Sequence, residues 1–150
     1  GEYVFHEIAL PHPDWQKNLP SQSFDRLVSF AVLHHIPGKE LRRNIIRTFT
    51  TLVTRESCVT VSVWQWQNSP RLKKRVLPWS MVGLSEEALD EGNVLVDWRA
   101  RETIGLRYVH TFSENELMSL GKHAGFSVID SFYSDGKSGD LALYQIWQLE

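Results

Sequence analysis

Residues 24–66 read "FDRLVSFAVLHHIPGKELRRNIIRTFTTLVTRESCVTVSVWQW", which is two apolar segments on either side of a segment with helical periodicity. The first apolar segment, "FDRLVSFAVL" (24–33), has the composition of a strand covered on both faces, and Pro37 and Gly38 end it. The last segment, "SCVTVSVWQW", is rich in β-branched and aromatic residues, which favours a second strand. The middle segment places six apolar residues on one helical face: Leu41, Ile45, Ile46, Phe49, Leu52 and Val53.

Strand, amphipathic helix and strand in this order predict a βαβ unit, and with it a parallel sheet. Residues 67–106 interrupt the pattern and are predicted to form an insertion or lid at the rim of that sheet. Regular structure returns with a Ser113-x-x-Glu116 capping box and a helix that Gly125 is placed to end. Two strand patterns around a Gly-rich turn then predict a closing antiparallel hairpin. We expect a single α/β domain over residues 1–150, with a mostly parallel sheet.

Composition excludes several classes of protein. A net charge of -2 and a pI of about 6.3 give no overall case for nucleic-acid binding, although a local basic patch at residues 71–75 stays open. The single cysteine, Cys58, rules out a disulfide framework and favours a reducing, cytoplasmic setting. No apolar run reaches about 18 residues, so no membrane-spanning segment is expected.

His34 and His35 stand where the first apolar segment ends. The residues alone leave three roles open: metal ligands, a catalytic base, or polar groups that mark where a strand leaves the core. Metal binding is the least favoured of these, because no third ligand lies at a suitable spacing. No metal site is predicted.

Taken in order, these segments resemble the class I S-adenosylmethionine-dependent methyltransferases. "SQSFDRLVSFAVLHHIP" is similar to the fourth-strand motif of that family, and "HAGFSVID" is similar to the entry into its sixth strand. The segment "GNVLVDWRARETIGLRYVHTFSENELMSLGKHAGF" resembles the tRNA wobble-uridine carboxymethyl methyltransferases, which carry a comparable W…RYYH…F-x-x-x-E-L segment. Val109 departs from that pattern, because it stands where the family often has a second tyrosine.

The resemblance implies a Rossmann-like methyltransferase sheet in the order 3-2-1-4-5-7-6, with S-adenosyl-L-methionine as cofactor. Ligands of such open sheets lie beyond the carboxyl ends of the strands. The implied cofactor-binding residues are Leu10, Ser29, Phe30 and Ala31. The implied catalytic and acceptor-site residues are His34, His35, Arg107, Tyr108 and His110. The implied acceptor is a tRNA base modification or a small carboxylate, and Arg107 would suit a carboxylate or a phosphate.

The resemblance also implies that parts are missing. The family carries a Gly-rich loop and an acidic residue for the cofactor, but the chain has no G-x-G, and Ala9 stands where an adenine-contacting Asp is usual. "EYVFHEIAL" (2–10) reads as the third strand of the fold. We therefore expect the C-terminal part of a methyltransferase domain, which lacks the first two βα units and has an incomplete cofactor site.

Loss of those units would expose the strand at residues 25–33 as an apolar edge. Residues 2–10 would pair with that edge, two copies would meet there as a homodimer, or another chain would supply the missing half. The alternative function is a non-catalytic methyltransferase-like module that binds RNA or a protein partner through the tryptophan-rich insertion.

Overall fold

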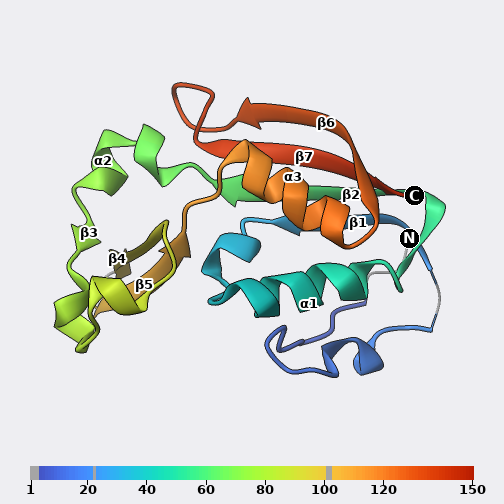
Figure 1. Ribbon diagram of the computed structural model, residues 1–150, viewed down its shortest axis with the longest axis horizontal. Helices are drawn as coiled ribbons and strands as arrows, with labels where there is room; N and C mark the ends of the chain where they lie inside the picture. Colours follow the sequence, from blue (N-terminus) through green and yellow to red (C-terminus); the bar gives the residue numbers. More distant parts are fainter. Residues whose placement is uncertain (1–3, 22, 101–102) are drawn as a thin grey trace.

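A four-stranded sheet forms the centre of the molecule (Figure 1). The computed structural model describes residues 4–21, 23–100 and 103–150. The sheet has the order β1-β2-β7-β6. Its strands are β1 (Phe24–Phe30), β2 (Val53–Trp64), β6 (Phe126–Ser134) and β7 (Ala142–Leu149). Strand β2 therefore lies in the interior of the sheet, where its run of valines is covered.

Two helices, α1 (Lys39–Phe49) and α3 (Glu114–His123), lie on the same face of this sheet (Figure 1). The predicted apolar face of α1 is confirmed, because Ile45, Ile46 and Phe49 are buried against the sheet. Val59, Val61 and Val63 of β2 are buried in the same core, because alternate side chains of a strand point to the same face of its sheet. The larger buried side chains of this core are Leu33, Phe112, Leu117, Phe126, Leu143 and Trp147.

The predicted βαβ unit is confirmed, since β1 and β2 are parallel and α1 connects them. The expectation of a mostly parallel sheet is wrong. Strand β7 runs antiparallel to both of its neighbours, β2 and β6, so only one of the three pairings is parallel. The physical reason is the short link between β6 and β7, because a parallel crossover needs a dozen or more residues. The closing hairpin itself is confirmed.

The predicted strand at residues 2–10 is wrong where the structure describes it. Residues 2 and 3 lie outside the described part, and residues 4–9 have no regular structure. Val4 and Phe5 are 70% and 94% exposed, so no neighbouring strand stabilises an extended ladder here. Residues 4–9 do not pair with β1, which is an edge strand, and the first of the three expectations for that edge is therefore incorrect.

Strand β1 is also less covered than its apolar composition predicts. Only Ser29 is buried among its seven residues, and Val28 and Phe30 are 61% and 52% exposed. These two side chains point away from the helices, because Leu27 and Ser29 lie in register with the buried Val59 and Val61. The face of the sheet opposite α1 and α3 is open along this edge.

A second sheet extends from the end of the main sheet at which β1 and β2 finish (Figure 1). It is antiparallel, in the order β3-β4-β5, and we call it the rim sheet: β3 (Val76–Leu77), β4 (Asn93–Ala100) and β5 (Thr103–His110). The short helix α2 (Pro70–Lys73) precedes it. The predicted insertion ended at residue 106, in the middle of β5. The remaining elements are 3-10 turns at Trp15–Asn18, Leu33–His35, Trp66–Asn68, Trp79–Val82 and Glu86–Ala88.

Helix α3 begins at its predicted cap. The Ser113 side chain accepts a hydrogen bond from the N–H of Glu116 at 3.1 Å. The Glu116 carboxylate completes the capping box by accepting a hydrogen bond from the backbone N–H of Ser113, and it also contacts His110. Gly125 follows the helix with a φ of 98°, a left-handed conformation that a glycine adopts without strain.

Candidate functional site

His34 lies in the 3-10 turn directly after β1 and is fully buried. Its Nδ1 accepts a hydrogen bond from the backbone N–H of Trp64 at 3.2 Å, and its ring stacks on the Trp64 indole at 4.9 Å. Its Nε2 is buried and has no hydrogen-bond partner among the described residues. Burial, followed by the charges of His35 and Arg107, lowers the pKa of His34 to about 3. The ring is therefore neutral at pH 7.

His35 is half-buried beside it and is arranged differently. Its Nδ1 lies 3.0 Å from the backbone carbonyl oxygen of Tyr108 in β5. Because a carbonyl only accepts, Nδ1 carries the proton and Nε2 keeps its lone pair. Burial lowers the pKa of His35. The hydrogen bond to the Tyr108 carbonyl raises this pKa and the charge of Arg107 lowers it further, so the net pKa is below the usual value. His35 is therefore a neutral imidazole whose Nε2 can accept a hydrogen bond and has no such bond from the described residues.

Arg107 comes to the same place from the rim sheet. Its guanidinium carbon lies 3.8 Å from the ring centroid of Trp98 and 6.0 Å from that of Trp64. The two indoles are nearly parallel, with an interplanar angle of 28° and centroids 6.2 Å apart. Cation–π contact holds the guanidinium against the aromatic faces. We call His34, His35, Trp64, Trp98 and Arg107 the strand-end cluster, because it lies where β1 and β2 end.

Tyr108 belongs to the strand-end cluster only through its carbonyl oxygen. Its hydroxyl accepts a hydrogen bond from Nη1 of Arg42 at 3.2 Å and donates to Oδ1 of Asn93 at 2.7 Å. Arginine has donors only, so the direction of both bonds is fixed. Burial is the largest cause that raises the pKa of Tyr108, which therefore stays a neutral hydroxyl.

His110 continues this chain of hydrogen bonds. Its Nδ1 lies 2.7 Å from Oδ1 of Asn93, and its Nε2 lies 2.7 Å from the carboxylate of Glu116. Both ring nitrogens thus face side-chain oxygens, one of Asn93 and one of the Glu116 carboxylate. Burial raises the pKa of Glu116, but the hydrogen bond and charge of His110 and the charge of Arg42 lower it, and the net pKa is lowered. His110 is held in place rather than free to meet a ligand.

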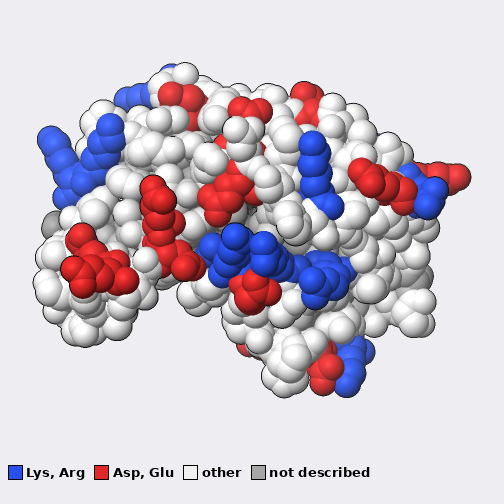
Figure 2. All heavy atoms as spheres, in the orientation of Figure 1, with Lys and Arg blue, Asp and Glu red and all other residues white. Residues whose placement is uncertain are grey.

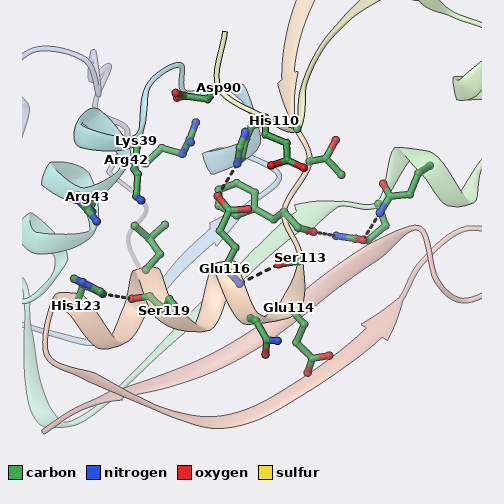
Figure 3. A pocket seen from close by; sticks show the side chains of 18 of the residues that line it. Lys39, Arg42, Arg43, Asp90, His110, Ser113, Glu114, Glu116, Ser119 and His123 are labelled. Atoms are coloured by element: carbon green, nitrogen blue, oxygen red, sulfur yellow. Dashed lines mark hydrogen bonds and ion pairs between the residues drawn. The ribbon is translucent and has the colours of Figure 1, made fainter. Parts of the chain in front are cut away.

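A polar pocket of about 1000 Å³ opens between α1, α3 and the turn at residues 90–92, and we call it the α1–α3 pocket (Figure 3). Basic side chains gather over α1 on this face of the molecule (Figure 2). His110 and Glu116 lie opposite α1 in the pocket (Figure 3). Its other charged or polar lining side chains include Lys39, Arg42, Arg43, Gln65, Gln67, Asp90, Glu91, Thr111, Ser113, Glu114, Asn115, Ser119 and His123.

An apolar groove of about 340 Å³ runs along β1 and brings together two of the predicted cofactor-binding residues, Leu10 and Ser29. Its other lining residues are Ile8, Trp15, Leu19, Phe24, Arg26, Leu27, Val28, Val32, Phe49 and Leu52. Phe30 and Ala31 do not line it; Ala31 has a φ of 55° and donates its N–H to Ser62. The groove would suit a flat apolar ring such as adenine, but no lining side chain is acidic. The residues present therefore fit only part of the expected cofactor.

The structure thus divides the predicted acceptor-site residues. His34, His35 and Arg107 lie together, Tyr108 connects two clusters, and His110 belongs to the hydrogen-bonded network beside the α1–α3 pocket. Sequence reasoning missed Arg42 and Asn93. A signal for Arg42 was present, because residue 42 lies on the apolar face of its helix, three and four positions before Ile45 and Ile46.

Two features are absent from the described part of the chain. No cluster of three or more His, Cys, Asp or Glu side chains is arranged to hold a metal ion there. Over the same residues, every helix is too short or too polar to cross a bilayer.

No family model and no curated protein matches the chain in sequence. Among solved structures it is similar to an S-adenosylmethionine-dependent methyltransferase from Clostridium acetobutylicum, with a TM-score of 0.62 and 8% identity over 94% of this chain and 62% of that one. A SAM-dependent methyltransferase from Methanosarcina mazei gives a TM-score of 0.61 and 22% identity over 89% of this chain and 63% of that one.

The 1,6-didemethyltoxoflavin-N1-methyltransferase of Burkholderia thailandensis, solved with its acceptor and S-adenosylhomocysteine bound, gives a TM-score of 0.55 and 17% identity over 89% of this chain and 48% of that one. The chain therefore spans 62% and 63% of the length of the first two structures and about half of the third. Identities this low bear on the fold alone. The described residues have a methyltransferase-like α/β fold with a mixed sheet.

Proposed function

We propose that this chain is part of an S-adenosylmethionine-dependent methyltransferase. The observation that carries the proposal is the sheet order β1-β2-β7-β6, which corresponds to strands 4-5-7-6 of the methyltransferase sheet. The strand-end cluster lies at the carboxyl ends of the two parallel strands, where open α/β sheets bind their ligands. Fold similarity to methyltransferases over 89–94% of the chain supports the same reading.

The cofactor would lie along β1. Leu10 and Ser29 face the apolar groove and would contact it there, and Phe30 and Ala31 would approach it from the end of the strand. When bound, S-adenosyl-L-methionine supplies an electrophilic methyl group. The groove lacks a carboxylate for the ribose hydroxyls, so we infer that polypeptide outside these 150 residues provides the remaining wall. The greater length of the compared structures supports this inference.

The acceptor would meet the strand-end cluster. Arg107 has the charge and planar shape to hold a carboxylate or phosphate, and Trp98 offers a flat surface beside it. Nε2 of His35 would accept a hydrogen bond from the acceptor, while Tyr108 holds the ring through Nδ1. His34 packs behind the cluster, and His110 acts as a positioning residue through Asn93. These features support a tRNA base modification or a small carboxylate as acceptor; a carboxylate is already ionised at neutral pH and needs no base.

Titration calorimetry with S-adenosylhomocysteine tests the cofactor proposal. We expect clear binding by the full-length polypeptide and weak or absent binding by residues 1–150 alone. Mass spectrometry of tRNA nucleosides from cells with and without the gene tests the acceptor. Failure of the full-length polypeptide to bind S-adenosylhomocysteine would end the enzyme proposal.

Arg107→Ala separates the acceptor role from a structural one. We expect the KM for the acceptor to rise about tenfold or more, as loss of a charged hydrogen bond predicts, with S-adenosylhomocysteine affinity unchanged. Arg71→Ala, on the exposed part of α2, is the matched control and should leave both values at the wild-type level. An equal loss of both affinities in Arg107→Ala would make the residue structural.

One observation favours the alternative, a non-catalytic binding module. Met81, Val82 and Leu84 in the insertion are 59%, 40% and 46% exposed, which is unusual for three apolar side chains so close together. Such a patch would suit a protein partner. Full-length protein that captures a partner through this patch but does not bind S-adenosylhomocysteine would favour the module over the enzyme.

A further inference from the structure

Arg42 is a buried cation without a carboxylate partner. Its side chain is 2% exposed, and among the described residues no Asp or Glu oxygen lies within 4.0 Å of it. Its two hydrogen bonds both leave from Nη1, to the carbonyl of Ile36 at 3.0 Å and to the Tyr108 hydroxyl at 3.2 Å. The Phe112 ring, whose centroid lies 5.4 Å from the guanidinium carbon, offsets part of the cost of burying this charge. A buried charge without an anionic partner still costs stability, so this arrangement needs an explanation.

The unused donors of Arg42 form one edge of the guanidinium. Nε and Nη2 have no hydrogen-bond acceptor in the part of the chain that the structure describes. Two parallel N–H groups on one edge of a guanidinium match the two oxygens of a carboxylate. The side chain also lines the α1–α3 pocket, where Figure 3 shows it on the side that α1 forms. A bidentate partner would therefore reach this edge from the pocket.

The charges around the pocket favour an anion on the α1 side. Lys39 is exposed on the same wall, one helical turn from Arg43, whose charge is already paired with Glu40 at 2.6 Å. The carboxylate of Glu116 contacts His110 at 2.7 Å and attracts the charge of Arg42 from a distance, but it forms no ion pair with Arg42 within 4.0 Å. Arg42 and Lys39 thus remain available to an incoming ligand.

The opposite rim limits which anion fits. Asp90, Glu91 and Glu114 line the same pocket and repel a group with more than one negative charge. A phosphate monoester carries about -1.5 to -2 at neutral pH, whereas a carboxylate carries one charge. A small carboxylate, with a neutral or cationic remainder toward residues 90 and 91, is the ligand that these charges allow.

We infer that the α1–α3 pocket binds a small organic carboxylate, which Arg42 holds through Nε and Nη2 while Lys39 adds a second charge. This site is distinct from the strand-end cluster and does not depend on methyl transfer. Arg42 also holds Tyr108, whose carbonyl fixes His35, so the pocket and the strand-end cluster share one connection.

Solution NMR of the 150-residue chain tests the inference with sodium acetate as the carboxylate probe, against sodium chloride at equal ionic strength and against inorganic phosphate. We expect saturable shifts of the amide signals of residues 39–43 and 110–116 with acetate, weaker shifts with phosphate, and none with chloride. Stronger saturation by phosphate would replace the carboxylate with a phosphate ligand and overturn the inference as stated. Absence of saturation with acetate would also overturn it.

Variants locate the site. Arg42→Gln should weaken acetate binding by about tenfold or more, and Lys39→Ala by about threefold, as loss of a buried and an exposed charge contact predict. Arg47→Ala is the matched control: it removes an exposed arginine of the same helix outside the pocket and should bind acetate normally. If Arg42→Gln fails to fold, Lys39→Ala decides. Equal losses in Lys39→Ala and Arg47→Ala would mean non-specific attraction to α1 and would refute the site.

Discussion

His34 and His35 are adjacent in sequence, but their Nδ1 atoms have opposite hydrogen-bonding roles. His34 accepts at Nδ1 from the backbone of β2, and His35 donates at Nδ1 to the backbone of β5. Their rings lie 4.1 Å apart, so a proton on one raises the cost of a proton on the other. Burial and this mutual repulsion both disfavour a proton on either ring, so the pair is neutral at pH 7. A neutral pair does not repel the charged Arg107 beside it.

His34 makes stability depend on pH in a defined direction. Its folded pKa is about 3, below the usual 6.5, so the unfolded chain binds the proton more readily between these values. The contribution of His34 to the free energy of unfolding is therefore fully present above about pH 6.5. It falls by about 1.4 kcal/mol for each pH unit between about pH 6.5 and pH 3. From pH 7 to pH 5 we expect this histidine to cost roughly 2 kcal/mol in urea unfolding.

His34→Gln checks that expectation, because the amide oxygen can accept from Trp64 and does not titrate. The variant should lose roughly 2 kcal/mol less than the wild-type protein between pH 7 and pH 5. His123→Gln, which removes an exposed histidine of α3, serves as the control and should keep the wild-type slope. Identical slopes in all three proteins would mean that His34 is protonated in the folded state.

At the scale of elements, α3 lies close to the sheet because Gly121 faces Trp147. A Cβ at residue 121 would come within 3.0 Å of the indole, which is fully buried. A glycine inside a helix costs about 1 kcal/mol relative to alanine. The close packing of α3 against β7 requires a glycine here in spite of that cost. The same approach brings Ser113 and Glu116 to the end of β5, where Glu116 meets His110.

Gly121→Val should destabilise the fold by about 2–3 kcal/mol, since a Cβ and its two methyl groups would have to enter a packed contact with a rigid ring. Chemical unfolding at pH 7 measures the change. Lys122→Val, at an exposed position of the same helix, controls for the helix propensity of valine and should cost well under 1 kcal/mol. A loss in Gly121→Val no larger than that of Lys122→Val would show that α3 can shift away from β7.

At the scale of the whole molecule, one face and one edge of the main sheet lack a covering layer among the described residues. Phe30, Tyr144 and Phe132 form a row on the face opposite the helices, with ring centroids 5.9 and 5.3 Å apart. Strand β1 adds Val28 and a free backbone edge. We propose that two copies of the isolated chain meet at this edge when no other polypeptide covers it.

Light scattering after size-exclusion chromatography should show a dimer that forms as concentration rises. Val28→Lys should shift the chain toward monomer, because a lysine on an edge strand opposes its pairing with another strand. The control is Ile129→Lys, which places the same charge on the other edge strand at a residue that is 59% exposed. A monomer at all concentrations would contradict the proposal, and so would an equal effect of both lysines.

Much of the local structure could be predicted from residue patterns. The apolar face of α1, the cap of α3 at Ser113 and the closing hairpin all depend on contacts between residues near in sequence, so their periodicity was visible. The same patterns failed at residues 4–9 and in the direction of β7. A strand requires a neighbour, and sequence periodicity does not state which neighbour is present.

The site shows the same division. Residue patterns alone predict polar rings directly after the first strand of the βαβ unit, because the stop at Pro37 and the spacing in α1 act locally. The positions of Tyr108 and His110 in the network of Arg42, and of Arg107 beside His35, depend on packing between segments that are far apart in the chain. Hydrogen bonds between distant segments form only after packing has fixed both ends, and no local pattern encodes their direction.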